Sequence, residues 1–172
     1  KRRAQIIEAF TKVLSQHGYA GATMLAVAEQ ANLSPGLLHH HFRDKREMLH
    51  ELLGSLVQKF RVSLGERRPG VALTLEDYVD AALKLDERSD SVAAKCWVAI
   101  LAEGLRDKAL MDAIKQKLEF EVQMIEKLSG NKFDFRQSSA VVSYILGALV
   151  FGAYAPKRTS GFAAPMGRRI LA

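Results

Sequence analysis

The sequence contains a single cysteine, Cys96, and this scarcity already restricts the class of protein. One cysteine excludes an intramolecular disulfide framework and fits a reducing compartment, so we expect a cytoplasmic protein. We expect Cys96 itself to be a small core residue rather than a reactive thiol. No signal peptide opens the chain, which starts at Lys1 without a methionine, so we also expect residues upstream of Lys1.

The residue patterns of common catalytic and metal sites are missing as well. There is no Gly-rich phosphate loop, no nucleophile elbow and no pair of carboxylates in an apolar setting. His39, His40 and His41 are consecutive, so on a helix they point about 100° apart and cannot converge on one metal. His17 and His50 have no suitably spaced partner. We therefore expect no enzymatic activity, no metal and no cofactor.

Basic charge is concentrated at one end of the chain. Residues 1–68 hold 11 Lys and Arg against 6 Asp and Glu, whereas residues 69–172 hold 14 against 13, and all five histidines lie within the first fifty residues. A basic end of this kind is what a polyanion-binding domain needs. Lys1, Arg2 and Arg3 begin the first predicted helix, where the helix dipole disfavours cations, so they form either a basic arm that contacts phosphate or a solvated terminus.

Residues 23–49 predict two short helices joined by a tight turn and followed by a third helix. Thr23 is a suitable N-cap for the first of these, and Asn32 tolerates the left-handed conformation that ends helices. Ser34 and Pro35 then supply an N-cap followed by proline at the first helical position, so the second helix opens almost at once. Two helices joined by so short a turn indicate a helix-turn-helix, in which the second helix lies in the DNA major groove.

Apolar spacing predicts how this unit packs. Leu38 and Phe42 are four residues apart on one face of the second helix, where they close a small core with three residues of the preceding segment, Val27, Ala28 and Leu33. Asp44 and Glu47 form a capping box for the third helix, which we expect to continue to about Leu64. A helix over residues 3–17, ending at Gly18, comes before the unit and completes a three-helix domain.

This segment resembles the DNA-binding domain of the tetracycline-repressor (TetR) family of bacterial transcriptional regulators. The resemblance rests on Thr23, the pair Val27-Ala28, the run from Ala31 to Leu38, His41-Phe42 and Lys45. His39 and His40 occupy two positions that are often Tyr-Tyr or Tyr-His in the family. A tyrosine hydroxyl contact to phosphate is therefore not carried over to this chain.

The resemblance implies an all-α fold, with a helix-turn-helix DNA-binding domain over residues 1–48 and a helical ligand-binding and dimerisation domain over residues 49–172. It implies a homodimer whose partners are a double-stranded DNA operator and a small-molecule effector. We expect phosphate contacts from Thr23, from Lys45 and from His39 or His40. We expect the exposed face of the second helix to contact base edges in the major groove, through Ser34, Pro35, Gly36, Leu37 and His39.

The remainder of the chain predicts further helices. A charged linker from Gly65 to Gly70 breaks the pattern, and a helix capped by Thr74 and Asp77 follows to about Arg88. The next helices begin at Asp90 or Ser91, at Asp107 and at Asp134, and a final one begins at Met166. For an effector pocket we expect some of the larger side chains of this half, each of which is equally compatible with an ordinary core position: Tyr78, Trp97, Phe120, Met124, Tyr144 and Phe151.

Residues 137–156 carry no charge and have the length of a membrane span. Gln137 and three serines interrupt their apolar character, so we favour a helix that is covered by a second copy of the chain over a membrane helix. Small residues on it allow another helix to approach closely. The interface we expect uses the helices at 107–129 and 134–155, through Leu118, Ile125, Ala140, Ile145, Gly147, Ala148 and Gly152.

Two functional hypotheses follow. In the first, the protein is a repressor that a small, apolar or aromatic effector releases from a palindromic operator. The effector acts by tilting the helix that runs from Asp44 into the C-terminal domain. In the second, the C-terminal half serves only assembly or protein partners and has no effector site. A ligand that raises the thermal stability of the protein would separate the two hypotheses.

Overall fold

The computed structural model describes residues 2–67, 72–83 and 90–159, together with residues 166, 167, 169 and 171. In these residues the chain is all-α, as predicted, and contains no strand. The helices are α1 (Arg2–Gly21), α2 (Met24–Gln30), α3 (Pro35–His41), α4 (Lys45–Arg67), α5 (Leu75–Leu83), α6 (Asp90–Gly104), α7 (Lys108–Leu128), α8 (Phe135–Tyr154) and α9 (Pro156–Thr159).

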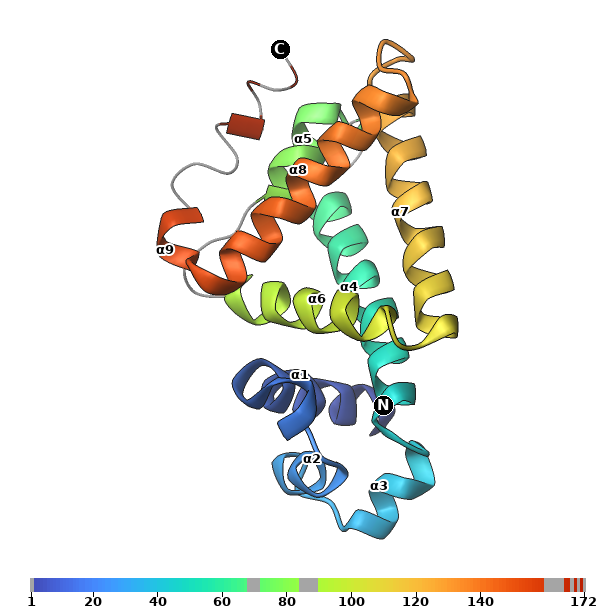
Figure 1. Cartoon of the computed structure of the whole chain (residues 1–172), viewed down its shortest axis with the longest axis vertical. Coiled ribbons are helices and arrows are strands. Elements are labelled where there is room, and N and C mark those ends of the chain that lie inside the picture. Colours follow the sequence, from blue (N-terminus) through green and yellow to red (C-terminus); the bar gives the residue numbers. More distant parts are fainter. Residues whose placement is uncertain are drawn as a thin grey trace.

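Helices α1, α2 and α3 form a small unit at one end of the molecule (Figure 1). The predicted capping residues begin α2 and α3, because Thr23 Oγ1 accepts a hydrogen bond from Ala26 N at 3.1 Å and Ser34 Oγ accepts one from Leu37 N at 3.3 Å. Gly18 interrupts α1 with φ 68 and ψ 179, a region of backbone space that is essentially reserved for glycine. The predicted end of the first helix at Gly18 is therefore confirmed as a kink, after which one more helical turn follows.

Helix α4 connects the two halves of the molecule. It begins beside α3 and rises into the group formed by α5 to α8 (Figure 1). Asp44 Oδ1 accepts hydrogen bonds from Arg46 N and Glu47 N, both at 2.9 Å. The Glu47 carboxylate accepts from Arg43 N at 2.9 Å, rather than from the N-cap residue as an ideal capping box requires.

The C-terminal helices begin largely at the predicted residues. Thr74 and Asp77 cap α5 reciprocally, Asp107 caps α7 through Leu110 N at 3.0 Å, and Asp134 caps α8 in a capping box with Gln137. The predicted break at Gly65 is wrong, because α4 continues through it to Arg67. The end of the 74–88 helix and the linker residues after Arg67 lie outside the described residues.

Two apolar clusters stabilise the molecule. The first combines buried residues of α1 to α4 with residues of α6 and α7, so the N-terminal unit shares its core with the next layer: Ile6, Phe10, Leu38, Phe42, Met48, Leu52, Cys96, Ile100, Leu110 and Ile114 belong to it. The second lies among α5, α7 and α8 and includes Tyr78, Val79, Leu83, Ile125 and Val141. Cys96 is fully buried, which confirms the core assignment, and burial raises the pKa of its thiol to about 11.

Candidate nucleic-acid interface and apolar cavity

The turn between α2 and α3 gives the N-terminal unit its helix-turn-helix geometry. Asn32 adopts the left-handed conformation with φ 54, and Leu33 N donates to the Ala28 carbonyl oxygen at 2.9 Å, which closes the end of α2. Ser34 then caps α3, and Pro35 occupies its first turn without requiring a hydrogen-bond acceptor. The two helices are therefore held at a fixed angle by local interactions.

One face of α3 is buried and the opposite face is exposed. Leu38 and Phe42 are fully buried in the first apolar cluster, whereas Leu37 is 42% exposed. Five more residues of the predicted DNA-contacting set, on α3 and in the turn before it, are exposed too: Ser34, Pro35, Gly36, His39 and His40. Thr23 is also exposed, at the start of α2. These residues of the helix-turn-helix are therefore all accessible at the surface.

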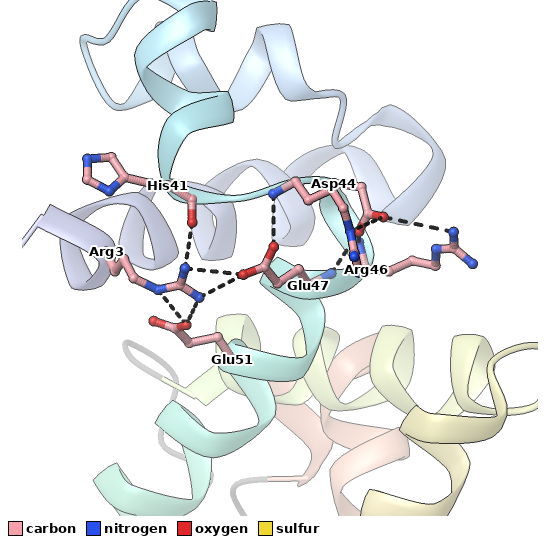
Figure 2. Close-up of polar contacts among 7 residues, drawn as sticks. Arg3, His41, Asp44, Arg46, Glu47 and Glu51 are labelled. Carbon is pink, nitrogen blue, oxygen red and sulfur yellow. Dashed lines mark hydrogen bonds and ion pairs between the residues drawn. The ribbon is translucent and has the colours of Figure 1, made fainter.

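Arg3 does not project from the molecule as a basic arm. Its guanidinium donates to Glu47 at 3.1 Å, to Glu51 and to the His41 carbonyl oxygen (Figure 2). It also lies over the Phe42 ring, 4.0 Å from the centroid. The pKa of Arg3 is raised, chiefly by its hydrogen bond to Glu51. Arg3 therefore ties the start of α1 to the end of α3 and the first turns of α4.

Lys45 also has a structural partner. Its ammonium donates to the Tyr19 carbonyl oxygen at 2.8 Å and lies 4.2 Å from the centroid of the Tyr19 ring. This contact ties the start of α4 to the end of α1. An ammonium carries three donors, so Lys45 retains hydrogen-bonding capacity for a phosphate while this contact is intact.

A cavity of about 430 Å³ lies among α4, α5, α6, α7 and α8. This volume is within the range of small-molecule sites, which runs from about 300 to 1,000 Å³. Its walls are mostly apolar, with Leu56, Val57 and Phe60 contributed by α4, Trp97 by α6 and Ile145 by α8. Because only three residues separate the end of α3 from the start of α4, the helix that lines this cavity is also the helix that leaves the helix-turn-helix.

Charged residues interrupt the apolar lining. Lys59 of α4 lines the cavity, as do Lys117 and Glu121 of α7, which form an ion pair with side chains only 14% and 16% exposed. Burial lowers the pKa of Lys117 to about 8 and raises that of Glu121 to about 7, and Arg61 lowers both. The attraction within the pair opposes the effect of burial on each partner.

Of the predicted pocket residues, only Trp97 lines this cavity. Tyr78 is buried in the second apolar cluster, and Met124 and Tyr144 pack against that cluster. Phe120 and Phe151 are 38% and 56% exposed on the outside of α7 and α8. These five residues do not line this cavity, because helical periodicity does not specify which neighbouring helix covers a side chain.

The residues predicted for the dimer interface fall into three groups. Ile125, Ala148 and Gly152 are buried within the single chain, so they are not available to a second copy. Leu118 and Ile145 line the cavity. Ala140 and Gly147 are exposed on α8, and an added side chain at Gly147 would meet nothing within 4 Å.

Helix α8 exposes an apolar stripe at helical spacing. The stripe, which we call the α8 face, consists of Ala140, Ser143, Gly147, Val150, Phe151 and Tyr154. By length and composition α8 is the one described helix that is able to cross a membrane, with 28% of its most apolar window buried in the molecule. Exposed apolar surface of this kind is typical of sites of interaction with another molecule.

Lys59, Lys117 and Glu121 were not identified from the sequence, although α7 contains a signal for two of them. The inward stripe of α7 runs through Ile114, Leu118 and Ile125, and Lys117 and Glu121 fall on the same side at spacings of three and four. Charged residues within an otherwise apolar stripe indicate that the stripe lines a cavity or that the charges form a buried ion pair. Among the described residues, no three His, Cys, Asp or Glu side chains lie close enough together to hold a metal ion.

The N-terminal unit is similar in sequence to a known protein family. Residues 6–52 match the family described as bacterial regulatory proteins, tetR family. Over 117 residues the chain is 29% identical to the HTH-type transcriptional regulator BetI of Paraburkholderia phytofirmans, a match that covers 63% of this chain and 57% of that protein. The match thus covers just over half the length of this relative.

Solved structures share the fold over nearly the whole chain. A transcriptional regulator from Rhodococcus sp. Rha1 superposes with a TM-score of 0.87 at 20% identity, covering 99% of this chain and 94% of that one. A transcriptional regulator from Saccharomonospora viridis in complex with choline superposes with a TM-score of 0.74 at 15% identity, covering 98% and 92%. At these identities the similarity establishes the arrangement of the helices.

Proposed function

We propose that the chain is a regulator of the tetR family, whose model matches residues 6–52, and that it is a cytoplasmic repressor that a small molecule releases from a palindromic operator. One observation carries this proposal. Helix α4 begins after a connection of only three residues from α3, and it supplies Leu56, Val57 and Phe60 to the wall of the cavity. A ligand in the cavity therefore contacts the element whose position sets the position of the recognition helix.

On the DNA side, α3 is the recognition helix. Ser34, Pro35, Gly36, Leu37 and His39 face the major groove, where Gly36 allows close approach of the backbone and Leu37 contacts a thymine methyl group. Thr23, Lys45 and His39 or His40 contact phosphates and fix the register of the helix. Residues 1–48 form the DNA-binding domain in this proposal, with a boundary in the first turn of α4.

Two copies of the chain are needed for specificity, since one short recognition helix reads only a few base pairs. We assign the dimer contact to the α8 face, because it is apolar, exposed and contains two small residues, Ala140 and Gly147, that permit close helix approach. The two-fold symmetry of such a dimer matches an inverted repeat in the operator, with half-sites about one helical turn or more apart.

Release follows from a difference in ligand affinity between two states. If the ligand binds better when α4 is tilted away from the DNA-bound position, it weakens DNA binding by the same coupling factor, on the order of 1 to 3 kcal/mol. The choline complex of the S. viridis neighbour supports a small-molecule site in this fold. The cavity of this chain supports it independently.

Selection from a random pool of double-stranded DNA tests the proposal first. We expect the full chain to enrich an inverted repeat, and fluorescence anisotropy then gives its affinity. A thermal-shift screen without DNA identifies ligands, because a molecule that binds only the folded state raises the melting temperature. Reciprocity is the deciding measurement, since operator DNA must weaken ligand binding by the factor with which ligand weakens DNA binding.

The alternative is a DNA-binding dimer whose C-terminal half serves only assembly or protein partners. The exposed α8 face favours this reading as much as it favours a regulated dimer. Equal ligand affinity with and without operator DNA would leave the alternative in place, and so would a screen that yields no ligand.

A further inference from the structure

The charges around the cavity are unequal in sign. Among the described residues that line it, Lys59 and Lys117 are cationic and Glu121 is the one carboxylate. Arg61, two residues after Lys59 on α4, lies 5.1 Å from the centroid of the Phe120 ring, and the Lys117 ammonium lies 5.3 Å from the same centroid. Two cations and one carboxylate therefore line the apolar cavity, and a third cation, Arg61, lies near the same aromatic ring as Lys117.

A ligand anion can replace Glu121 as the ion-pair partner of Lys117. Its side chains are only 14% and 16% exposed, so each charge has lost most of its hydration and depends on its partner. A ligand anion that binds Lys117 takes over the role of Glu121. The displaced carboxyl is then discharged by a proton at little cost, since burial already raises its pKa to about 7.

A cationic ligand meets the opposite situation. To contact Glu121 it must displace Lys117, and it then enters a cavity that Lys59 and Lys117 line with positive charge. Like charges at close range in a partly desolvated site repel strongly. The sign of the surroundings therefore favours an anion over a cation.

We propose that the cavity binds an amphipathic organic anion, a carboxylate on an aliphatic or aromatic body. Its charged group contacts Lys117, and its body lies against Trp97 and the apolar walls supplied by α4 and α8. This inference rests on the proposed function, for which it names the chemical class of the effector.

Three probes of equal chain length test the inference directly: octanoate, octanamide and octylammonium. Trp97 is the single tryptophan of the chain and lines the cavity, so its intrinsic fluorescence reports binding to the full-length wild-type chain without DNA. We expect octanoate to bind at least tenfold more tightly than octanamide, and octylammonium to bind more weakly than either. This comparison requires no variant and therefore no assumption about folding.

Two variants and one control test whether Lys117 contacts the carboxylate of the ligand. Lys117→Met should lower the affinity for octanoate at least tenfold and leave octanamide unchanged, whereas Glu121→Gln should raise the affinity for octanoate. Lys115→Met is the matched control, because Lys115 is exposed on the same helix and does not line the cavity. Circular dichroism spectra and melting curves verify that each variant is folded.

Preference for octylammonium, equal affinity for the three probes, or no binding of any of them would overturn the inference. The same titrations with operator DNA separate it from the proposed function. If octanoate shows the expected preference but leaves DNA affinity unchanged, the anion site stands and the release mechanism fails. If a cationic molecule releases the DNA instead, the release mechanism stands and the anion site fails.

Discussion

Arg3 is a residue whose apparent role changes between the sequence and the structure. As part of Lys-Arg-Arg it suggests a phosphate-binding arm, yet its guanidinium contacts Glu47, Glu51 and the His41 carbonyl oxygen (Figure 2). It also packs over the Phe42 ring. A guanidinium is planar and carries five donors, so it can satisfy several acceptors from different helices at once. Arg3 thereby fixes the end of the recognition helix against α4.

Arg3→Ala should lower the free energy of unfolding by about 1 kcal/mol, because exposed ion pairs are weak singly and this one is strengthened by its network. It should also weaken DNA binding, since the end of α3 loses its anchor. Urea denaturation and fluorescence anisotropy measure the two effects. Arg2→Ala is the control: Arg2 contacts only Gln5 among the described residues, and a change within about 0.5 kcal/mol is expected there.

Gly36 offers a cleaner test of the DNA-facing surface. A methyl group at this position meets nothing within 4 Å, and the backbone there is not in the left-handed region. Gly36→Ala should therefore preserve the fold or stabilise it by about 0.5 to 1 kcal/mol, as expected for glycine replaced by alanine in a helix. Its affinity for operator DNA should fall, because the added methyl group lies where the backbone approaches the bases.

Gly54→Ala is the matched control for that experiment. Gly54 lies in α4, is exposed and has equally open surroundings, so the substitution changes helix propensity without entering the α3 surface. Unchanged DNA affinity is expected. If Gly36→Ala binds operator DNA as tightly as the wild type, α3 is docked differently from the arrangement proposed above.

At the scale of helices, local signals were predicted well from the sequence. The caps formed by Thr23, Ser34 and Asp134 depend on residues within three or four positions of one another, so the sequence contains the whole interaction. The recognition helix and its exposed face follow from the same local patterns. The resemblance to a known family reinforced this part of the prediction.

Packing between helices was predicted poorly, for a physical reason. Periodicity identifies the apolar side of a helix but not the helix that covers it. Phe151 thus belongs to an apolar stripe yet lies at the surface, and Ile125 was expected at an interface yet is fully buried in the chain. The cavity is lined by residues of six helices, from Thr11 of α1 to Leu149 of α8, and no local pattern specifies such a space.

The exposed α8 face predicts how a substitution on this helix changes dimerisation. Gly147→Leu should leave the single chain intact, because the new side chain meets open space, and should hold two α8 helices apart in a dimer. Sedimentation should then show a larger monomer fraction at micromolar concentration and a weaker affinity for an inverted repeat. Gly54→Leu makes the same change on another exposed helical glycine and should leave the mass unchanged.

A wild-type protein that stays monomeric at micromolar concentration would contradict the assignment of the α8 face to dimerisation. Its exposed apolar residues would then require a different partner.

For the whole molecule, Glu121 predicts how stability depends on pH. Its pKa is raised from 4.5 to about 7, so between these values the folded chain holds a proton that the unfolded chain has released. Stability contributed by this site is therefore lost as pH rises from about 5 to 7. The loss should amount to about 2 kcal/mol, which is less than the full shift implies because the ion pair with Lys117 offsets part of it.

The comparison with Glu121→Gln isolates this effect, since other titrating groups are common to both proteins. Chemical denaturation at pH 5, 6 and 7 gives the free energy of unfolding of both proteins. The difference, variant minus wild type, should become more positive at each higher pH. If the free energies of unfolding of the two proteins change with pH in parallel, Glu121 has an ordinary pKa and its surroundings are more hydrated than the structure indicates.

The shared apolar cluster has one further consequence, which concerns cooperativity. Phe10 of α1, Met48 of α4 and Ile100 of α6 lie in one cluster, so opening the N-terminal unit exposes the underside of the C-terminal helices too. Amide hydrogens in the middle of α1 and α6 should then exchange with solvent through the same opening event, with equal free energies. Residues 1–48 excised alone should remain largely unfolded, and calorimetry of the intact chain should show a single transition.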